Sequence, residues 1–167
     1  SINAHANGSK HENAMFRNSI KPGRFAKAPM IADPVNLFDS APDGDGAAAI
    51  ILTSMERAAD LVPHSVRIMA SAAATDTLTL HDRSDLMFLK AAALSASKAY
   101  KLAKIGLVDI HLFEMHDAYT ILSTLTLEAA GFAERGGGWK LAQDNNIGLN
   151  GSLPVSTFGG LKARGNP

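Results

Sequence analysis

Short, predominantly apolar runs alternate with helical patterns along this chain, and this alternation limits the possible folds more than any other feature. The runs are "GAAAIILTS" (46–54), "HSVRIMASAAA" (64–74) and "VDIHLFEMH" (108–116). Runs of this length and composition are typical of strands buried in a sheet, although the alanine content of 64–74 also permits a helix. We therefore predict an α/β fold with a layered architecture and a mixed, mostly parallel central sheet.

Helical patterns fill the intervals between these runs, each with a capping residue in a suitable place. The clearest helix is expected over residues 84–106. Ser84 or Asp85 would supply its N-cap, and Gly106 would supply a left-handed C-cap. The other expected helices, with their capping residues, are 54–62 (Ser54) and 118–132 (Gly131).

Residues 1–43 form a segment that differs from the rest of the chain. They are rich in Asn, Lys, Gly and Pro, and only "HENAMFRNSI" (11–20) has the pattern of a short helix. We therefore divide the chain into this irregular segment and an α/β domain over 44–167. The chain begins without Met and stops in the polar, glycine-rich run "GLKARGNP", so we expect a fragment or a processed chain with a truncated domain.

Charge and composition exclude several classes of protein. The 16 basic and 16 acidic residues are interspersed and give a formal net charge of zero, so we expect no nucleic-acid partner. No apolar run approaches the ~20 residues that a membrane span needs. The chain has no cysteine, which excludes disulfides, thiolate metal sites and a cysteine nucleophile within it. We expect a cytoplasmic protein.

The stretch "EMHDAYT" (114–120) places a titratable His-Asp pair between two apolar segments. In open α/β sheets, ligands bind beyond the carboxyl ends of strands, close to helix N-termini. We expect Asp117 to cap the following helix and His116 to stand near its positive end. A neutral imidazole N–H there can donate to a developing oxyanion, which suits an acyl carbonyl. The alternative is that Asp117 only caps the helix and His116 only fills a boundary position.

Other motifs give weaker signals. The pair Asp43 and Asp45 hints at a calcium loop, but the remaining ligands of that loop are missing, so a turn is favoured. The glycines at 136–138 are not followed by Lys-Ser/Thr, which argues against a phosphate loop. His111 and His116 would point to opposite faces of one strand, and we expect no metal site.

Five blocks of the sequence resemble one protein family in content and in order. They are "HANGSKHENAMFRNSI" (5–20), "ADPVNLFDSAPDGDGAAAIILTS" (32–54), "VRIMASAAATDT" (66–77), "HDAYTILSTLTLEAAGF" (116–132) and "LPVSTFGGLKARGNP" (153–167). Together they resemble the C-terminal half of thiolases, and most closely the branch of sterol carrier protein x and the archaeal acetyl-CoA acetyltransferases. The similarity covers nearly the whole chain.

The resemblance implies a fold, a reaction and a set of partners. A thiolase consists of two similar α/β halves, and this chain resembles the second, with residues 1–43 as the end of the loop domain that covers coenzyme A. Such enzymes are acyltransferases of lipid metabolism that make or cleave a carbon–carbon bond next to a thioester. The implied partners are an acyl-CoA substrate, the missing N-terminal half and a second copy in a homo-oligomer, with no covalently bound cofactor.

The resemblance also implies roles for individual residues. His116 would stand in the oxyanion hole that polarises the thioester carbonyl, and Asn166 would occupy the position of the family's catalytic histidine. Gly159 and Gly160 would allow the backbone to approach the acyl chain closely. The remaining implied contacts, along the path of the pantetheine arm, come from Ser71, Ala72, Ala73 and Ala74.

Departures from the family limit what this chain can do alone. Both catalytic cysteines belong outside it, and the amide of Asn166 has no useful titration near neutral pH. We therefore expect the isolated chain to be inactive and to expose apolar surface where the first half would pack. Two alternatives remain: a non-catalytic thiolase-fold module for acyl-CoA binding or assembly, and an unrelated hydrolase that uses His116 and Asp117 but has no identified nucleophile.

Overall fold

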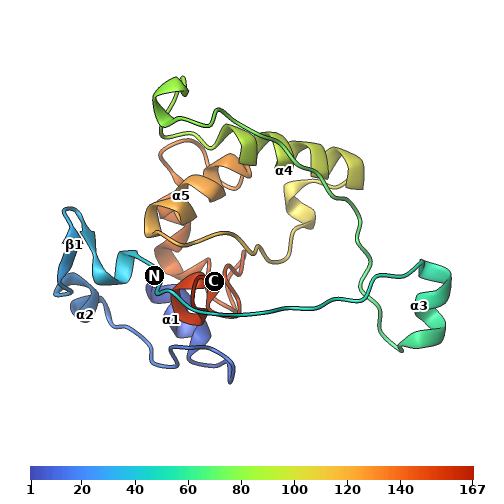
Figure 1. Cartoon of the computed structure of the whole chain (residues 1–167), viewed down its shortest axis with the longest axis horizontal. Helices are drawn as coiled ribbons and strands as arrows, with labels where there is room; N and C mark the ends of the chain where they lie inside the picture. The colour runs from blue at the N-terminus through green and yellow to red at the C-terminus, as the bar shows by residue number, and fades with distance from the viewer.

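Helices and irregular segments make up most of the computed structural model, which describes residues 1–167 (Figure 1). The α-helices are α1 (Ile2–Gly8), α2 (Pro22–Ala26), α3 (Met55–Leu61), α4 (Lys90–Ala103), α5 (Thr120–Ala129) and α6 (Gly160–Arg164). The strands are β1 (Met30–Ala32) and β2 (Val35–Asn36), and the 3-10 helices are η1 (Leu37–Asp39), η2 (Leu80–Asp82), η3 (Leu107–Asp109) and η4 (Gly138–Asn145). None of the helices is both long enough and apolar enough to cross a lipid bilayer.

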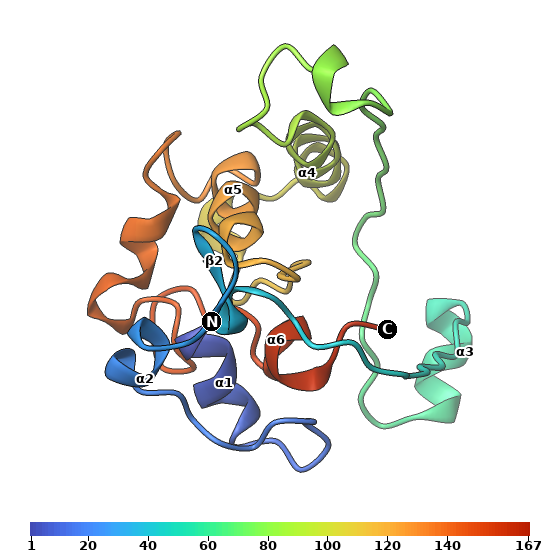
Figure 2. The ribbon, with the colours of Figure 1, turned by 60° about the vertical axis from the view of Figure 1, so that its left-hand side comes forward.

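Two pairs of helices organise the body of the molecule. α1 packs against α6, and α4 packs against α5, which also contacts η4. In Figures 1 and 2, α5 lies between α4 on one side and the α1–α6 pair on the other. In both views α3 stands apart from this body, at the tip of an extended excursion of the chain.

A small apolar core lies between α5 and the segment that precedes α6. Its buried members are Leu127, Leu153 and Val155. The partly buried side chains that pack against them are Ile110, Phe113, Met115, Phe132, Leu141 and Ile147. Because Met115 directly precedes His116, this core supports the loop that carries the candidate histidine.

Two of the expected helix ends are confirmed. At the start of α3, the Ser54 hydroxyl accepts a hydrogen bond from the Arg57 N–H at 3.4 Å. At the end of α5, Gly131 adopts a φ of +89° and the Phe132 N–H donates to the Leu127 carbonyl at 3.0 Å. This is the Schellman arrangement, in which a left-handed residue follows the helix and glycine is favoured.

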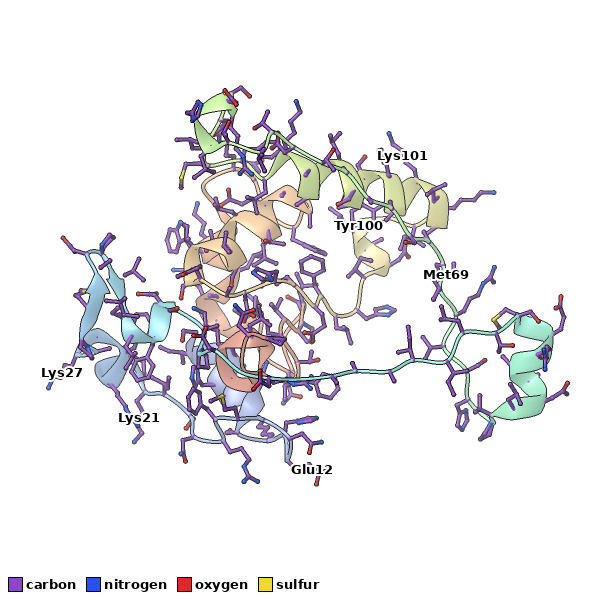
Figure 3. All side chains as sticks on the ribbon, in the orientation of Figure 1. Glu12, Lys21, Lys27, Met69, Tyr100 and Lys101 are labelled. Carbon is purple, nitrogen blue, oxygen red and sulfur yellow. The ribbon has the colours of Figure 1, made fainter.

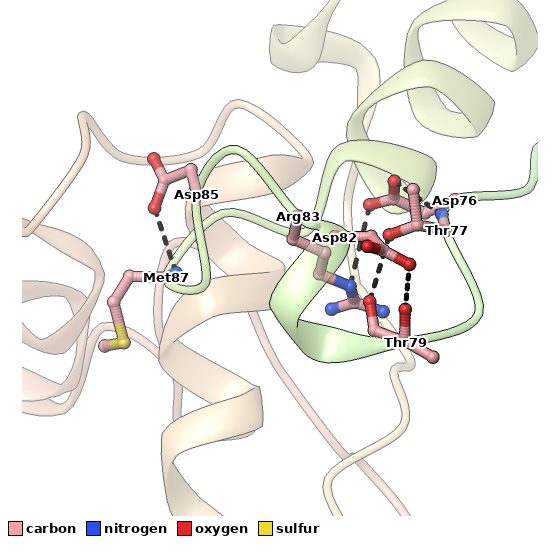
Figure 4. A network of polar contacts seen from close by, with 7 residues as sticks. All are labelled: Asp76, Thr77, Thr79, Asp82, Arg83, Asp85 and Met87. Atoms are coloured by element: carbon pink, nitrogen blue, oxygen red, sulfur yellow. Dashed lines mark hydrogen bonds and ion pairs between the residues drawn. The ribbon is translucent and has the colours of Figure 1, made fainter.

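The expected start of the long helix is wrong, because its proposed capping residue forms a turn instead (Figure 4). α4 begins at Lys90, and the Asp85 carboxylate accepts a hydrogen bond from the Met87 N–H at 2.9 Å. Arg135 pairs with the same carboxylate. A side chain that bonds the backbone two residues ahead stabilises a turn that competes with the helix. The preceding loop is held by polar contacts among Asp76, Thr77, Thr79, Asp82 and Arg83.

The expected C-cap of the same helix is also wrong. Lys104, rather than Gly106, adopts the left-handed conformation, with a φ of +56°. The Ile105 N–H donates to the Tyr100 carbonyl at 3.1 Å, which closes the helix earlier than expected. Gly106 instead is the N-cap of η3, and its N–H donates to the Asp109 carboxylate at 2.8 Å.

Residues 11–20, expected to form a short helix, are not helical. The Asn13 N–H donates to His11 Nδ1 at 3.2 Å, a local contact that competes with helical hydrogen bonds. α2 begins farther along the chain at Pro22, whose fixed φ suits the first position of a helix.

The sheet expected from the apolar runs is only partly formed. Phe113, in the third run, makes a parallel bridge to Val155, and β1 pairs with β2 in an antiparallel hairpin. Residues 46–54 and 64–74 run extended but pair with no strand (Figure 1). A strand forms only beside a hydrogen-bonded neighbour, and no other backbone of the chain pairs with these two runs.

The arm formed by residues 46–74 carries apolar side chains in solvent. The expectation that its runs are buried does not hold in this structure, since Ile51 is 92% exposed and Val66 is 95% exposed. Other exposed apolar side chains of the arm are Ile50, Leu52, Met55, Leu61, Val62, Ile68 and Met69. The expected exposure of apolar surface is therefore present, and surfaces of this kind are typical of interaction sites.

We expect the isolated 167-residue chain to bind an apolar-surface dye and to self-associate through the arm. Ile51→Lys combined with Val66→Lys should lower both signals while leaving the thermal midpoint almost unchanged, because both side chains are exposed. Dye fluorescence and sedimentation velocity measure the two effects. Val108→Lys, at a position that is 90% exposed but outside the arm, is the matched control. A wild-type chain that sediments as a monomer without dye binding would contradict the expectation.

Candidate functional site

The loop of residues 114–120 follows a short parallel backbone pairing. The Phe113 N–H donates to the Pro154 carbonyl at 2.9 Å, and the Ser156 N–H donates to the Phe113 carbonyl at 3.3 Å. This pairing brings the loop beside residues 156–161, named here the glycine turn, which end in the first residues of α6. Because α5 begins at the end of the loop, His116 stands just before a helix N-terminus, as expected, and its side chain is exposed.

Asp117 caps a different helix from the one expected. Its side chain is buried, and the carboxylate accepts hydrogen bonds from the Leu161 N–H at 2.6 Å and from the Ser156 hydroxyl at 3.4 Å. α5 follows Tyr119 and has no side-chain cap, whereas Gly159, before α6, has no side chain with which to cap. Asp117 therefore satisfies the free N–H of α6 from a distant part of the chain.

Two buried ionisable groups of opposite sign lie where α6 meets this loop. Burial raises the pKa of Asp117, while the Leu161 N–H and the Lys162 ammonium oppose that rise. Lys162 is 1% exposed, and its ammonium donates to the Asp39 carbonyl. Burial lowers the pKa of Lys162 to about 8, against the opposing effect of Asp117 and Asp39.

Gly159 and Gly160 are required by internal contacts of the fold. Both have positive φ, +103° and +55°. A Cβ at Gly159 would lie 2.9 Å from both the Ala163 Cβ and the Gly8 Cα, and a Cβ at Gly160 would overlap the Asp117 carboxylate. Both positions therefore need glycine whether or not a ligand is present. Their expected approach to an acyl chain stays a prediction.

The backbone of residues 41–44 contacts both Asn166 and the loop that carries His116. The Asn166 N–H donates to the Pro42 carbonyl at 2.8 Å, and the Gly44 N–H donates to the Asn166 carbonyl at 3.1 Å. At the other end of this segment, the Ala41 N–H donates to the Ala118 carbonyl at 2.7 Å. The structure therefore brings these two expected site regions to the same part of the molecule.

Two of the cavities beside these segments exceed about 300 Å³. The larger, of about 530 Å³, has the size of a small-molecule site and is lined by Gly46, Glu114, Met115, Phe158, Leu161 and Pro167, among others. The smaller, of about 370 Å³, is lined by His5, Phe16, Arg24, Phe38 and Lys162, among others. Burial lowers the pKa of His5, whose ring stacks on Phe16 with 6.1 Å between the ring centroids.

The four residues expected along the pantetheine path lie elsewhere in this structure. They are Ser71, Ala72, Ala73 and Ala74, and they belong to the second extended run of the arm. The Lys98 ammonium of α4 donates to the Ala73 carbonyl at 3.5 Å. Figure 3 labels Met69 on the same stretch, between α3 and α4. The structure does not bring these residues to the loop of His116, and their expected contact with a ligand stays a prediction.

Sequence reasoning missed two residues that shape the site. The Glu114 carboxylate accepts hydrogen bonds from the Thr157 N–H at 2.6 Å and from the Thr157 hydroxyl at 2.5 Å. The signal for Glu114 was available, because acidic residues stand on both sides of His116 between apolar segments. No sequence pattern marks Lys162 as buried. The structure also contains no group of three or more His, Cys, Asp or Glu side chains placed to hold a metal ion.

Known proteins provide three further findings. The sequence profile described as "Thiolase C-terminal domain-like" matches residues 72–167. The acetyl-CoA acetyltransferase of Methanothermobacter thermautotrophicus is 38% identical over 167 residues, which is 100% of this chain and 44% of that protein. Sterol carrier protein 2 of Rattus norvegicus is 26% identical over 159 residues, which is 92% of this chain and 29% of that protein.

The structural comparison agrees with these sequence matches. The solved structure titled "Ltp2-ChsH2(DUF35) aldolase" superposes with a TM-score of 0.92 and 25% sequence identity, over 98% of this chain and 44% of that chain. The expected thiolase-like fold is therefore confirmed, although the paired sheet is sparse. The chain spans less than half the length of the relatives that it matches.

The buried Lys162 should make the stability of the chain depend on alkaline pH. Below pH of about 8 the ammonium is charged in both the folded and the unfolded states. Above this pH the folded protein releases the proton, while the unfolded chain keeps it up to the ordinary lysine pKa of 10.5. The free energy of unfolding should therefore rise through this window, by at most about 1.4 kcal/mol per pH unit.

Urea denaturation at a series of pH values measures this slope. Lys162→Met should remove it, whereas Lys101→Met, at an exposed lysine on α4 (Figure 3), should leave it unchanged. Equal slopes in the wild type and in Lys162→Met would show that the buried ammonium is not the cause.

Proposed function

The chain belongs to the thiolase C-terminal domain-like family, and from this premise we propose that it forms part of a thiolase-type acyltransferase acting on acyl-CoA thioesters. The reaction class is the making or cleaving of a carbon–carbon bond next to the thioester carbonyl. One observation carries the proposal: the exposed His116 stands before the N-terminus of α5, on a loop tied by backbone hydrogen bonds to the segment of Asn166. Its neighbours Glu114 and Met115 line a cavity of about 530 Å³.

In this proposal His116 is the oxyanion donor. Its ring N–H donates to the thioester carbonyl oxygen as negative charge develops there, and the N–H groups at the start of α5 add positive potential. Such a donor acts without giving up its proton, so it stabilises the transition state and does not need to titrate during the reaction. Coenzyme A enters only as the thioester of the substrate, and no covalently bound cofactor is part of the proposal.

The remaining chemistry has to come from outside this chain. It contains no cysteine, so the nucleophilic thiol belongs to the missing half, and the complete protein would join the two halves in one pocket. Asn166 can donate and accept hydrogen bonds but cannot take a proton from a thiol near neutral pH. Its amide would therefore orient a reacting group, and a different group would act as the base. A homo-oligomer remains part of the proposal.

A non-catalytic module that binds acyl-CoA is the second candidate, and Asn166 is the observation that favours it. One related protein, from Mycobacterium tuberculosis, is named 17-hydroxy-3-oxo-4-pregnene-20-carboxyl-CoA lyase. The relatives of this chain therefore include proteins that are not named as acyltransferases. Thiolysis of acetoacetyl-CoA by the complete protein separates the candidates. Turnover supports the acyltransferase, whereas coenzyme A binding by calorimetry without any turnover supports the module.

Replacing the proposed oxyanion donor should lower turnover while leaving the fold intact. In the complete protein, His116→Ala should reduce the rate of thiolysis by ~10²–10³, the usual effect of losing one such donor. Steady-state kinetics measures the loss, and circular dichroism checks the fold. His111→Ala, which alters an exposed histidine ahead of the loop, is the matched control. An unchanged rate in His116→Ala would remove this residue from the mechanism.

Restoring a titratable group at the position of Asn166 should increase turnover. A general base typically contributes a factor of 10²–10⁴, and we expect Asn166→His to raise the rate of thiolysis at least ~10-fold near pH 8. The pH dependence of kcat should gain an ionisation that the wild type lacks. Asn150→His, at an exposed position, controls for the added imidazole. A rate at or below that of the wild type would show that a base at this position is not limiting.

A further inference from the structure

Two carboxylates flank His116 in the sequence, and both bond to the glycine turn. On one side, Glu114 accepts from the Thr157 N–H at 2.6 Å and from the Thr157 hydroxyl at 2.5 Å. On the other side, Asp117 accepts from the Leu161 N–H at 2.6 Å. The two contacts therefore reach opposite ends of the same turn, and the candidate histidine lies between their anchor points on the loop.

The glycine turn has a conformation that needs such support. Ser156 is buried and has a φ of +50°, which is uncommon for a residue other than glycine. Gly159 and Gly160 also have positive φ, and the Gly159 N–H donates to the Ser156 carbonyl at 2.9 Å. Backbone in sparsely populated regions persists only where its surroundings hold it. The hydrogen bonds to Glu114 and Asp117 help to stabilise the turn in this conformation.

His116 itself makes no side-chain hydrogen bond in the structure, and its side chain is exposed. Its position therefore depends on the backbone that carries it. That backbone is fixed on both sides by side chains that reach the glycine turn, and the turn continues through α6 to Asn166. The loop and the turn are thus joined at two points, which restricts both the distance and the angle between them.

We propose that Glu114 and Asp117 are positioning residues, which fix His116 relative to the segment that ends in Asn166. This inference rests on the proposed function for its effect on the rate, but the mechanical part stands on the contacts alone. Displacement of a catalytic group by about 1 Å can cost ~10²-fold in rate. The acceptor oxygens carry this role, since in each contact a backbone N–H or a hydroxyl donates to the carboxylate.

The first experiment measures the backbone order of His116 by NMR relaxation in the complete protein. Glu114→Ala should lower the order parameter of residues 114–117 from the rigid value of about 0.85 to below about 0.7. Glu114→Gln keeps an acceptor oxygen and should restore the wild-type value. Asp117→Asn also keeps an acceptor oxygen and should show the wild-type order parameter. This variant is preferred to Asp117→Ala, which would leave a cavity at the buried site.

A matched control separates positioning from general stability. The Glu128 carboxylate accepts from the Gly138 N–H at 2.9 Å, which is the same kind of contact on α5, away from the loop. Glu128→Ala should lower the thermal midpoint without changing the order at His116. If Glu114→Ala leaves the order parameter unchanged, or if Glu128→Ala lowers it equally, the positioning inference is overturned.

The second experiment measures kcat and KM in the complete protein. Glu114→Ala should lower kcat at least ~10-fold with KM within about twofold of the wild type, and Glu114→Gln should retain most of the activity. An unchanged kcat in Glu114→Ala overturns the effect on catalysis. If the wild type has no turnover while the order parameter responds as expected, the proposed function fails and the positioning of His116 is still supported.

Discussion

The hydrogen bond between the buried Asp117 carboxylate and the Leu161 N–H is the contact on which the candidate site depends. It joins the loop before α5 to the first turn of α6. Removing the carboxylate would leave the Leu161 N–H without its partner, at a cost of about 1–3 kcal/mol. Gly160 leaves room for the carboxylate, and the buried Lys162 supplies a nearby positive charge. The two segments therefore act as one unit.

The capping residues show where sequence reasoning succeeds and where it fails. Ser54 and Gly131 were correctly predicted because their partners lie within the same turn of chain. Asp117 is a residue type favoured at N-caps, but the N–H that it accepts from belongs to α6, which is distant in the sequence. Local spacing does not reveal which of two helices such a side chain will cap. The position of His116 before α5 was predicted, whereas the role of Glu114 depends on the long-range pairing of Phe113 with Val155.

The strands show a related limit. An apolar run indicates that a segment tends to be buried, but burial also requires a surface that covers it. The third run is covered by Val155 and the apolar core, and one of its residues, Phe113, forms a parallel bridge. The first two runs have no such neighbour, so the same composition is found in an exposed arm. Family resemblance was the more reliable guide to the fold, since it draws on the order of whole blocks rather than on single segments.

The arm has a consequence for the lifetime of the chain in a cell. Extended backbone with free donors and acceptors is a template on which other chains can add, and apolar side chains beside it strengthen that tendency. Quality control recognises such segments, so a chain with an uncovered arm is held by chaperones or degraded. The steady-state amount of this polypeptide should therefore follow the supply of whatever shields residues 46–74, more closely than it follows the rate of its own synthesis.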